Sequence, residues 1–385
     1  MTTTIDNEHK TFNVPNLRFP EFEGEWEKTT FGNIATGFDY GMNAAAKAYD
    51  GENKYIRITD IDESSSTYDD KDIVSPDGTL SDNYLVKERD ILLARTGAST
   101  GKTYLYRKSD GKLYYAGFLI RANVTTHNPY FVFSQLHTHR YWRWVSIMSA
   151  RSGQPGINSQ EYSSFPVFTT SIQEENKIAK LLSLLDERIS TQNKIIEDLK
   201  KLKSAISERL FKDTKGDVIT LSEICDIVKG EQINGELLSE HGKYYVMNGG
   251  TDPSGYYDNY NVEAYTISIS EGGNSCGYVQ FNRCPFWCGG HCYSIQNIAD
   301  NVYNLYLYHY LKTEEKVIMK LRIGSGLPNI QKKDLATFKI KLPTSEQQKA
   351  ISDILSLLEQ KAEIEEQMLI AMQAEKQYLL RQMFI

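Results

Sequence analysis

The sequence predicts an α+β fold: two tandem α/β domains separated by two long helices that form an antiparallel coiled coil, the whole being a pseudo-two-fold duplication. Two stretches, 172–211 and 345–384, carry apolar residues in alternating steps of four and three, the pattern of a coiled-coil seam. The strand-like runs before each stretch follow one another in the same order twice. Both observations indicate a domain and a long helix, each present in two copies.

The two seams are offset by 173 residues and share their defects. The first consists of Ile178, Leu182, Leu185, Ile189, Ile196, Leu199, Ile206 and Leu210, and the second of Ile351, Leu355, Leu358, Leu369, Met372, Leu379 and Met383, with Ala362 at the place of Ile189. Polar residues interrupt both seams at the same two layers, namely Gln192 and Lys203, then Glu365 and Lys376. One such stripe is usually a helix packed on a globular core, but two in-phase copies, each about 60 Å long, favour pairing with each other.

Composition bounds the class of protein. A chain of 385 residues is long enough for two or three domains with their own cores. No apolar run approaches the length of about 18 residues that a membrane span needs, and the start MTTTIDNEHK lacks the apolar core of a signal peptide. Five cysteines, an odd number, indicate reduced thiols, and we expect a cytoplasmic protein without a membrane partner.

The repeated order of segments predicts the domain boundaries. The Gly/Pro loop RSGQPGINSQEYSSFPV recurs as GSGLPNIQKKDLATFKI at the same offset as the seams. We predict an N-terminal arm over 1–25, a first domain over 26–170, the central helix over 171–211, a linker over 212–217, a second domain over 218–342 and the C-terminal helix over 343–385. A single helix is expected over 130–149. The domains diverge while the helices keep register, so the domains carry something variable.

Charge is uneven along the chain. Residues 50–83 hold ten acidic residues against three basic ones, residues 87–151 reverse this with eleven basic against three acidic, and residues 312–341 hold eight basic against three acidic. Basic residues interleaved with Tyr, Trp and His fit a surface that follows phosphates, and a charge-mixed solvated face explains either stretch equally well. The net charge of −7 is no nucleic-acid signature by itself.

Two motifs suggest chemistry and fail on spacing. GASTGKT, from Gly97, has three residues where a phosphate-binding loop needs four, and a strand-like run follows it instead of a helix. We expect a Gly-rich turn with Arg95, Ser99 and Lys102 exposed at its tip. Cys276, Cys284, Cys288, His291 and Cys292 match no paired CxxC arrangement, so we expect free thiols and no metal. No catalytic constellation of Ser/His/Asp, Cys/His or paired carboxylates stands out.

Taken together, several motifs resemble the specificity subunit of type I restriction–modification enzymes over nearly the whole chain. They are LRFPEFEGEW, DILLARTGASTGK, the SGQPGIN and SGLPNI loops, GGNSCGYV, PFWCGGHCYSI, and QEENKIAKLLSLLDERI with its counterpart EQQKAISDILSLLEQKA. The resemblance implies that each domain reads one half of a bipartite site on double-stranded DNA and that the helices separate the domains. It also implies that two methyltransferase subunits using S-adenosylmethionine, and two restriction subunits using ATP and Mg, surround this non-catalytic chain.

Loop position and chemistry suggest which residues contact DNA. The candidates are Arg95, Thr96, Ser99, Lys102, Arg151 and Gln154 in the first domain, and Asn248, Asn274, Ser275, His291 and Asn329 in the second. The alternative function is a duplicated coiled-coil adaptor without DNA specificity, which would show no steep salt dependence of duplex binding. If the chain is a specificity subunit, the helices should act as a ruler that sets the unread spacer between two different words.

Overall fold

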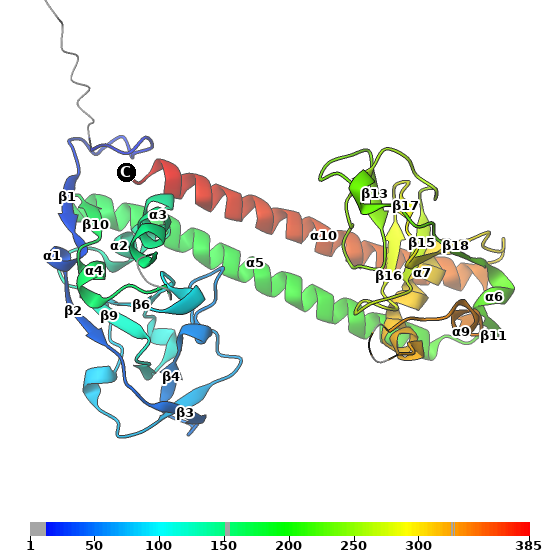
Figure 1. Cartoon of the computed structure of the whole chain (residues 1–385), viewed down its shortest axis with the longest axis horizontal. Coiled ribbons are helices and arrows are strands. Elements are labelled where there is room, and N and C mark those ends of the chain that lie inside the picture. Colours follow the sequence, from blue (N-terminus) through cyan, green and yellow to red (C-terminus); the bar gives the residue numbers. More distant parts are fainter. Residues whose placement is uncertain (1–12, 151–154, 325, 327) are drawn as a thin grey trace, which may run out of the picture. The chain divides into compact units, whose positions relative to one another are not determined.

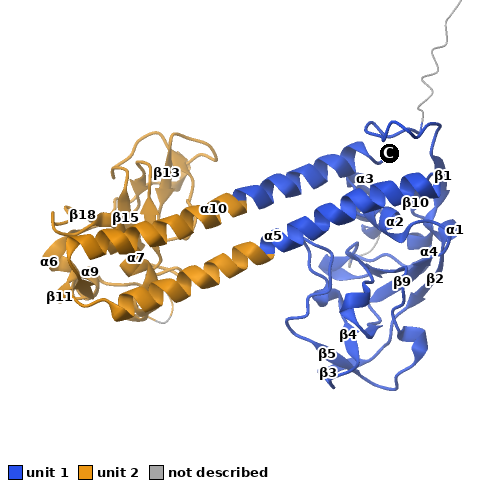
Figure 2. Ribbon diagram, turned by 180° about the vertical axis from the view of Figure 1, so that it is seen from behind, with its two compact units in different colours: residues 1–193, 367–385 blue, residues 194–366 orange. Residues whose placement is uncertain are grey.

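The computed structural model describes residues 13–150, 155–324, 326 and 328–385 (Figure 1). It divides into two compact units: unit 1 comprises residues 1–193 and 367–385, and unit 2 comprises residues 194–366 (Figure 2). Each unit holds one mixed domain and parts of both long helices. The predicted domain boundaries remain predictions, because this division cuts the two helices instead of separating them from the domains.

Unit 1 is built on a four-stranded antiparallel sheet in the order β2-β9-β6-β7. Small two-stranded pairs, β1–β10, β3–β5 and β4–β8, surround it. The elements are β1 (Glu27–Thr30), α1 (Phe31–Ile34), β2 (Ala35–Tyr40), β3 (Ala45–Ala48), β4 (Lys54–Ile56), η1 (Ile58–Asp60), β5 (Val74–Asp77), η2 (Asp82–Tyr84), β6 (Asp90–Ala94), η3 (Gly97–Ser99), β7 (Thr103–Leu105), η4 (Lys108–Asp110), β8 (Leu113–Tyr115), β9 (Leu119–Val124), α2 (Pro129–Gln135), α3 (His139–Ser149), α4 (Ser159–Ser163) and β10 (Pro166–Thr169).

Unit 2 repeats this plan with the sheet order β12-β18-β15-β16, so the duplication seen in the sequence is also a duplication of topology. The first and last strands of each domain pair with one another, β1 with β10 and β11 with β19. The elements are β11 (Asp217–Thr220), α6 (Leu221–Ile224), β12 (Asp226–Lys229), η5 (Gly235–Leu237), β13 (Tyr244–Met247), β14 (Tyr256–Tyr257), β15 (Thr266–Ser270), β16 (Val279–Asn282), β17 (Trp287–Cys288), β18 (Cys292–Gln296), α7 (Asn304–Thr313), α8 (Glu315–Ile318), η6 (Met319–Leu321), α9 (Lys332–Ala336) and β19 (Lys339–Leu342).

The long helices α5 (Ile172–Asp213) and α10 (Ser345–Gln382) follow β10 and β19 after short connections. In unit 2, Lys200 pairs with Glu366 and Lys203 with Glu359, so residue numbers rise along α5 while those of their partners fall along α10. The two helices therefore run antiparallel. In unit 1, Ile178 and Leu182 share a core with Met383, and Asp186 pairs with Lys376, which gives the same direction.

All predicted seam positions of both helices are buried or half-buried. Ile178, Leu182 and Leu355 are 0–1% exposed because they also enter a domain core. Each helix end is held by an aromatic side chain: Phe384 packs against Trp26 and Phe131 in unit 1. Its counterpart in the repeat, Phe211, packs against Tyr306 and Tyr310 in unit 2.

The N-terminal segment around the LRFPEFEGEW motif is tied to both helices of unit 1. The Arg18 guanidinium donates to both carboxylate oxygens of Glu174 at 2.7 Å, and the Leu17 amide donates to the Gln382 carbonyl at 2.8 Å. Trp26 Nε1 also donates to Glu174, whose side chain is almost fully buried. A buried carboxylate needs such partners, which explains why this polar arm carries Arg and Trp at these places.

Two local predictions were wrong. The single helix expected over 130–149 is two helices, because Thr138 ends one turn and caps the next by accepting from the Tyr141 amide. The Gly/Pro loop contains a short helix, α4, which starts with a capping box between Asn158 and Glu161. Within the described residues, none of the helices is both long and apolar enough to cross a lipid bilayer.

The seam makes a direct prediction about stability. Leu355 is fully buried, whereas Leu357, two residues along the same helix, is 67% exposed. Leu355→Ala should lower the free energy of unfolding by about 2–5 kcal/mol, since it leaves a cavity, while Leu357→Ala should stay within about 0.5 kcal/mol of the parent. Chemical denaturation of both variants measures this. Equal effects would show that Leu355 is not a seam residue.

Candidate functional site

The turn between β6 and β7 gathers the first-domain candidates. Arg95, Thr96, Ser99 and Lys102 lie on it, and the loop after the undescribed residues 151–154 runs beside it. The Gly97 amide donates to the Pro155 carbonyl at 3.0 Å, and the Ile157 amide donates to the Arg95 carbonyl at 2.9 Å. Arg151 and Gln154 fall outside the described residues, so their placement stays a prediction.

The tip of this turn is less exposed than the sequence suggested. Arg95, Ser99 and Lys102 are half-buried rather than exposed. The Arg95 guanidinium lies 4.6 Å from the centre of the Tyr40 ring, and Lys102 Nζ lies 3.5 Å from the Glu63 carboxylate. Long cationic side chains cover neighbouring surface in this way while their heads keep free donors, which accounts for the difference.

In unit 2 the corresponding turn lies between β15 and β16 and carries Asn274, which is exposed, and Ser275, which is half-buried. Asn329 is paired with Gly272 and with Ile323 through backbone bridges. The His291 amide donates to Oδ1 of Asn248 at 3.0 Å, and the His291 side chain is 62% exposed. The structure thus gathers the second-domain candidates around the end of the inner strands β15 and β18 from which this turn projects.

Four residues at these two places were missed by the sequence analysis. Phe118, which is 59% exposed, and Tyr40 lie beside Arg95. Glu271 lies beside His291 and pairs with Lys229. A cavity of about 540 Å³ opens next to Arg95 and is lined by Tyr40, Phe118, Met42, Asn43 and Tyr55 among others. Aligning DILLARTGASTGK with TISISEGGNSCGY places Glu271 at the position of Arg95, so the repeat held a signal for that residue.

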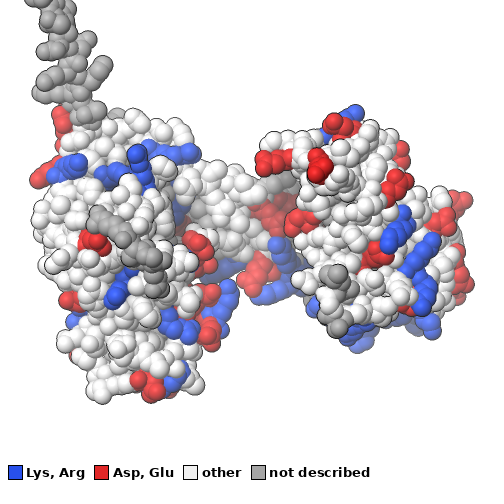
Figure 3. Space-filling model, viewed as in Figure 1, with Lys and Arg blue, Asp and Glu red and all other residues white. Residues whose placement is uncertain are grey.

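The basic stretch of the first domain is partly neutralised from within. Lys112 pairs with Glu52 at 2.9 Å, Arg121 with Asp39 at 3.1 Å and Lys108 with Glu88 at 2.9 Å. Figure 3 shows Lys and Arg interspersed with Asp and Glu on the visible face of each unit, without one continuous basic field. These ion pairs favour the charge-mixed interpretation for the members of the stretch that they involve.

The two lysines that interrupt the seams, Lys203 and Lys376, form ion pairs that reach into the domains. In unit 2, Lys203 Nζ lies 2.8 Å from the Glu359 carboxylate, which also accepts from the Tyr308 hydroxyl at 2.9 Å. In unit 1, Lys376 lies 2.6 Å from Asp186, which accepts from the Tyr130 hydroxyl. Lys203 and Lys376 are repeat equivalents, and so are Asp186 and Glu359. Each layer therefore fixes the helix pair to a helix of its domain.

Burial sets the protonation of this site in unit 2. Burial alone would raise the pKa of Glu359, but Lys203 and then Tyr308 lower it below its usual value. Burial, followed by the Glu359 charge, raises the pKa of Tyr308 far above its usual value. Burial lowers the pKa of His309 to about 4; its Nε2 lies 3.0 Å from the Ser356 hydroxyl. Glu359 is thus ionised, and His309 beside it is neutral, at neutral pH.

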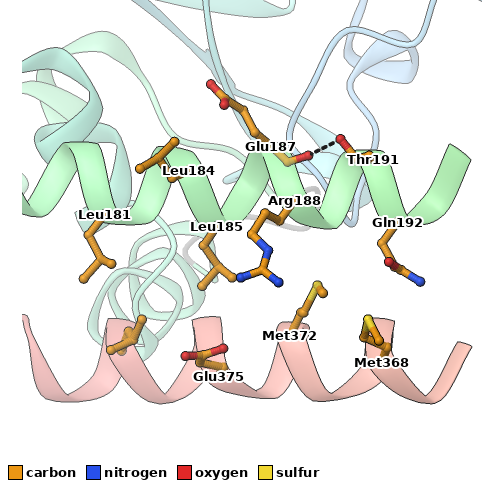
Figure 4. A pocket seen from close by; sticks show the side chains of 11 residues that line it. Leu181, Leu184, Leu185, Glu187, Arg188, Thr191, Gln192, Met368, Met372 and Glu375 are labelled. Atoms are coloured by element: carbon orange, nitrogen blue, oxygen red, sulfur yellow. Dashed lines mark hydrogen bonds between the residues drawn. The ribbon is translucent and has the colours of Figure 1, made fainter. Parts of the chain in front are cut away.

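Apolar grooves run along the helix pair in both units. In unit 1 a groove of about 610 Å³ lies between α5 and α10, with Leu181, Leu184 and Met368 among its walls and Glu187, Arg188 and Glu375 beside them (Figure 4). In unit 2 a groove of about 490 Å³ is lined by Ile206, Leu210, Ile351 and Ile354, with Arg209 and Asp213. Leu184, at 42% exposed, is typical of apolar side chains that the seam leaves uncovered.

All five cysteines are free, and Cys276, Cys288 and Cys292 are buried. Among the described residues, no group of three or more His, Cys, Asp or Glu side chains is arranged to hold a metal ion. Hydrogen bonding to Cys292, together with burial, raises the pKa of Cys288 far above its usual value. A thiol in this state is a poor metal ligand and a poor nucleophile.

Comparison with known proteins gives consistent matches. A family model described as type I restriction modification DNA specificity domain matches residues 24–201 and 215–373. A putative type I specificity subunit of Mycoplasma genitalium is 33% identical over 146 residues, 37% of this chain and 38% of that protein. The type I restriction enzyme MjaVIII specificity subunit of Methanocaldococcus jannaschii is 24% identical over 326 residues, 73% of this chain and 74% of that protein.

Solved structures share the fold. The crystal structure of the S subunit of a type I restriction–modification system from M. genitalium has a TM-score of 0.70 at 20% identity, covering 97% of this chain and 99% of that one. A chain from a structural study of complex assembly and conformational transition of the type I R-M system has a TM-score of 0.55 at 16% identity, covering 93% of this chain and 96% of that one.

The sequence alignments span less than two thirds of the length of several relatives. They cover 38% and 39% of the two Mycoplasma proteins and 65% of the putative MjaX specificity subunit.

The neutral, buried His309 predicts an acid dependence of stability. Its pKa is about 4 in the folded chain, so between about pH 6.5 and pH 4 the unfolded state binds a proton that the folded state does not. The free energy of unfolding should therefore fall by up to about 1.4 kcal/mol for each unit by which the pH is lowered in this window. The contribution of His309 to this fall should be absent in His309→Gln. Denaturation midpoints at several pH values measure it, with the exposed His241→Gln as control. Parallel pH profiles of parent and His309→Gln would contradict it.

Proposed function

The chain belongs to the family of type I restriction–modification DNA specificity proteins, and on that premise we propose that it reads a bipartite, asymmetric site on double-stranded DNA. Each domain reads one half of the site. The observation that carries this proposal is one sheet topology used twice, with different side chains on equivalent turns. The shared sheet is a rigid scaffold, and its turns present polar side chains of the kind that read base edges. Because these side chains differ between the domains, the two halves of the DNA site should differ in sequence.

The chain itself acts without catalysis in this proposal. Adenine methylation with S-adenosylmethionine and ATP- and Mg-dependent translocation and cleavage belong to partner subunits, two methyltransferase and two restriction subunits. In the described part of the chain, four of the five thiols are buried, and the ion pairs of the helix seam hold the fold together, which is consistent with a role in recognition and assembly. Mapping of methylated adenines by the complex assembled with its methyltransferase subunits tests the proposal. A two-word site is expected, and methylation without any sequence preference would refute it.

The rival function, a coiled-coil adaptor, predicts different behaviour toward DNA. A specificity subunit contacts phosphates, so the affinity of its complex for duplex DNA should fall steeply with salt concentration. An adaptor would show neither this slope nor a preferred sequence. Exchange of residues 26–170 for another family member's first domain should change one word only, which an adaptor cannot explain.

We place the docking of the methyltransferase subunits on the grooves of the helix pair. Their apolar walls beside charged rims, as around Leu184, suit an amphipathic helix of a partner. Leu184→Asp should weaken assembly roughly tenfold or more, because it places a charge in the groove, and should leave the unfolding midpoint of the isolated chain near that of the parent. Titration of methyltransferase subunits against both proteins measures it. Ile147→Asp, on an exposed position of α3, is the matched control, and equal assembly of all three would disprove the docking site.

We propose further that the helices set the spacer between the two words. Readers on one face of B-DNA sit about one turn, or 34–36 Å, apart, so half-site centres about ten base pairs apart are expected. Seven residues inserted after Asn193 and after Glu366, which are repeat equivalents at which the two units divide, preserve the seam phase. The helices gain about 10.5 Å, which corresponds to about three base pairs.

Methylation mapping of this insertion variant should give the same words with a spacer about three base pairs longer. Insertion of three residues at the same places is the control, since it breaks the heptad phase and should impair pairing of the helices. An active seven-residue variant with an unchanged spacer would rule out the ruler.

A further inference from the structure

One position of the repeated frame carries opposite charges in the two domains. Backbone bonds fix the equivalence. The Arg95 amide donates to the Phe118 carbonyl at 3.0 Å, and the Glu271 amide donates to the His291 carbonyl at 2.9 Å. The carbonyl groups show the same equivalence. The Arg95 carbonyl accepts from the Ile157 amide at 2.9 Å, and the Glu271 carbonyl accepts from the Ile330 amide at 2.8 Å. Arg95 and Glu271 thus occupy one place in the fold, and so do Phe118 and His291.

Tyr40 of the first domain and Lys229 of the second are a third pair of equivalent residues. Tyr40 ends β2 and Lys229 ends β12, and the residue that follows each donates its amide to the first residue of the neighbouring strand, Leu119 or Cys292. The first domain therefore presents Tyr40, Arg95 and Phe118 where the second presents Lys229, Glu271 and His291. One cation beside the turn is common to both clusters, and what holds it in place differs.

In the first domain an aromatic ring holds the cation. The Arg95 guanidinium lies over the Tyr40 ring, and the Tyr40 hydroxyl is itself fixed by the Ser159 amide at 3.3 Å. Within the described part of the chain, no carboxylate or carbonyl accepts from the Arg95 guanidinium. Stacking fixes the plane of the fork and leaves its donors free, which is the state that bidentate recognition of two neighbouring acceptors requires.

In the second domain a carboxylate holds the cation. Oε1 of Glu271 lies 2.7 Å from Lys229 Nζ and accepts from the Tyr293 hydroxyl at 3.0 Å. Oε2 faces the His291 ring at 3.9 Å. The Glu271 side chain is only 12% exposed, whereas those of Lys229 and His291 are 54% and 62% exposed. Glu271 is thus placed to orient Lys229 and has little surface of its own to offer.

We propose that this position sets the base read by each domain: Arg95 reads a guanine in the first word, and Glu271 is a positioning residue that aims Lys229 at a guanine in the second. The inference rests on the proposed function and deepens it. The O6 and N7 atoms of guanine form a major-groove acceptor pair. The planar fork of Arg can bond both atoms by itself, whereas a Lys ammonium is a flexible point charge that needs a neighbour such as Glu271 to aim it. Each word therefore contains a guanine at the base pair that faces this position.

The first arm of the test separates base reading from phosphate contact. Arg95→Lys keeps the charge and loses the planar fork, so the complex with methyltransferase subunits should still bind DNA and lose roughly tenfold or more of its preference for guanine at one base pair of the first word. Selection from randomised duplexes, followed by sequencing, measures the preference. Arg143→Lys, at an exposed position of α3, is the matched control and should select the parental site.

The second arm concerns Glu271. Glu271→Gln keeps the shape and the hydrogen bond from Tyr293 and removes the charge that holds Lys229, so guanine preference should fall in the second word alone, as it should in Lys229→Gln. Glu263→Gln, an exposed carboxylate in the same domain, is the control. A purely structural Glu271 would change the unfolding midpoint and leave the selected word intact.

The outcomes distinguish this inference from the proposed function. If the parental complex selects no sequence, the proposed function fails. If it selects a two-word site and both Arg95→Lys and Glu271→Gln select the same two words with the same preference, the proposed function stands and this inference is wrong. Loss of guanine preference in the expected word of each variant supports it.

Discussion

The ion pairs that cross the helix seam are the constraint on which the rest of the structure depends. Removing a lysine and a carboxylate from water is unfavourable unless the two groups lie close together and their remaining donors and acceptors are hydrogen-bonded. Lys203 with Glu359, and Lys376 with Asp186, meet this condition only because a tyrosine hydroxyl of the adjoining domain supplies a further bond. A shifted register or a parallel arrangement would leave these half-buried charges without partners. Polar layers thus select one alignment that the apolar seam alone would not.

Much of the fold could be predicted because its strongest signal is local. An apolar period of 3.5 residues can be recognised within a few helical turns of sequence. Its second occurrence, 173 residues later, is independent support for the same assignment. The antiparallel direction followed from the matching polar layers. The partners of those layers could not be predicted, because Asp186 and Glu359 stand one position after the seam and resemble ordinary solvent-facing residues. Only the tertiary structure shows that they turn inward.

The candidate site shows the same division between local and tertiary information. The turns that carry Arg95 and Asn274 were predictable from their glycines and from the strand-like runs on either side. Tyr40 and Lys229 were not, because each lies on a strand that is distant in sequence from the turn it adjoins, β2 and β12. The break after Gln135 was missed because a threonine cap competes with helix continuation through a single hydrogen bond. The sequence left open whether the basic stretch is one surface or a charge-mixed face, because only the tertiary structure shows which cations meet the acidic stretch before it, as Lys112 meets Glu52.

The aromatic ends of the two helices have a consequence for the order in which the chain can fold. Unit 2 is continuous, from residue 194 to residue 366, but unit 1 takes its last helical piece from residues 367–385. Trp26 meets Phe384 only after the ribosome has passed all of unit 2. The domain made first on the ribosome is therefore the domain completed last, and until then its core exposes the apolar surface that Phe384, Met383 and Leu380 later cover. Termination of translation between residues 366 and 380 would thus leave unit 2 whole and the core of unit 1 incomplete.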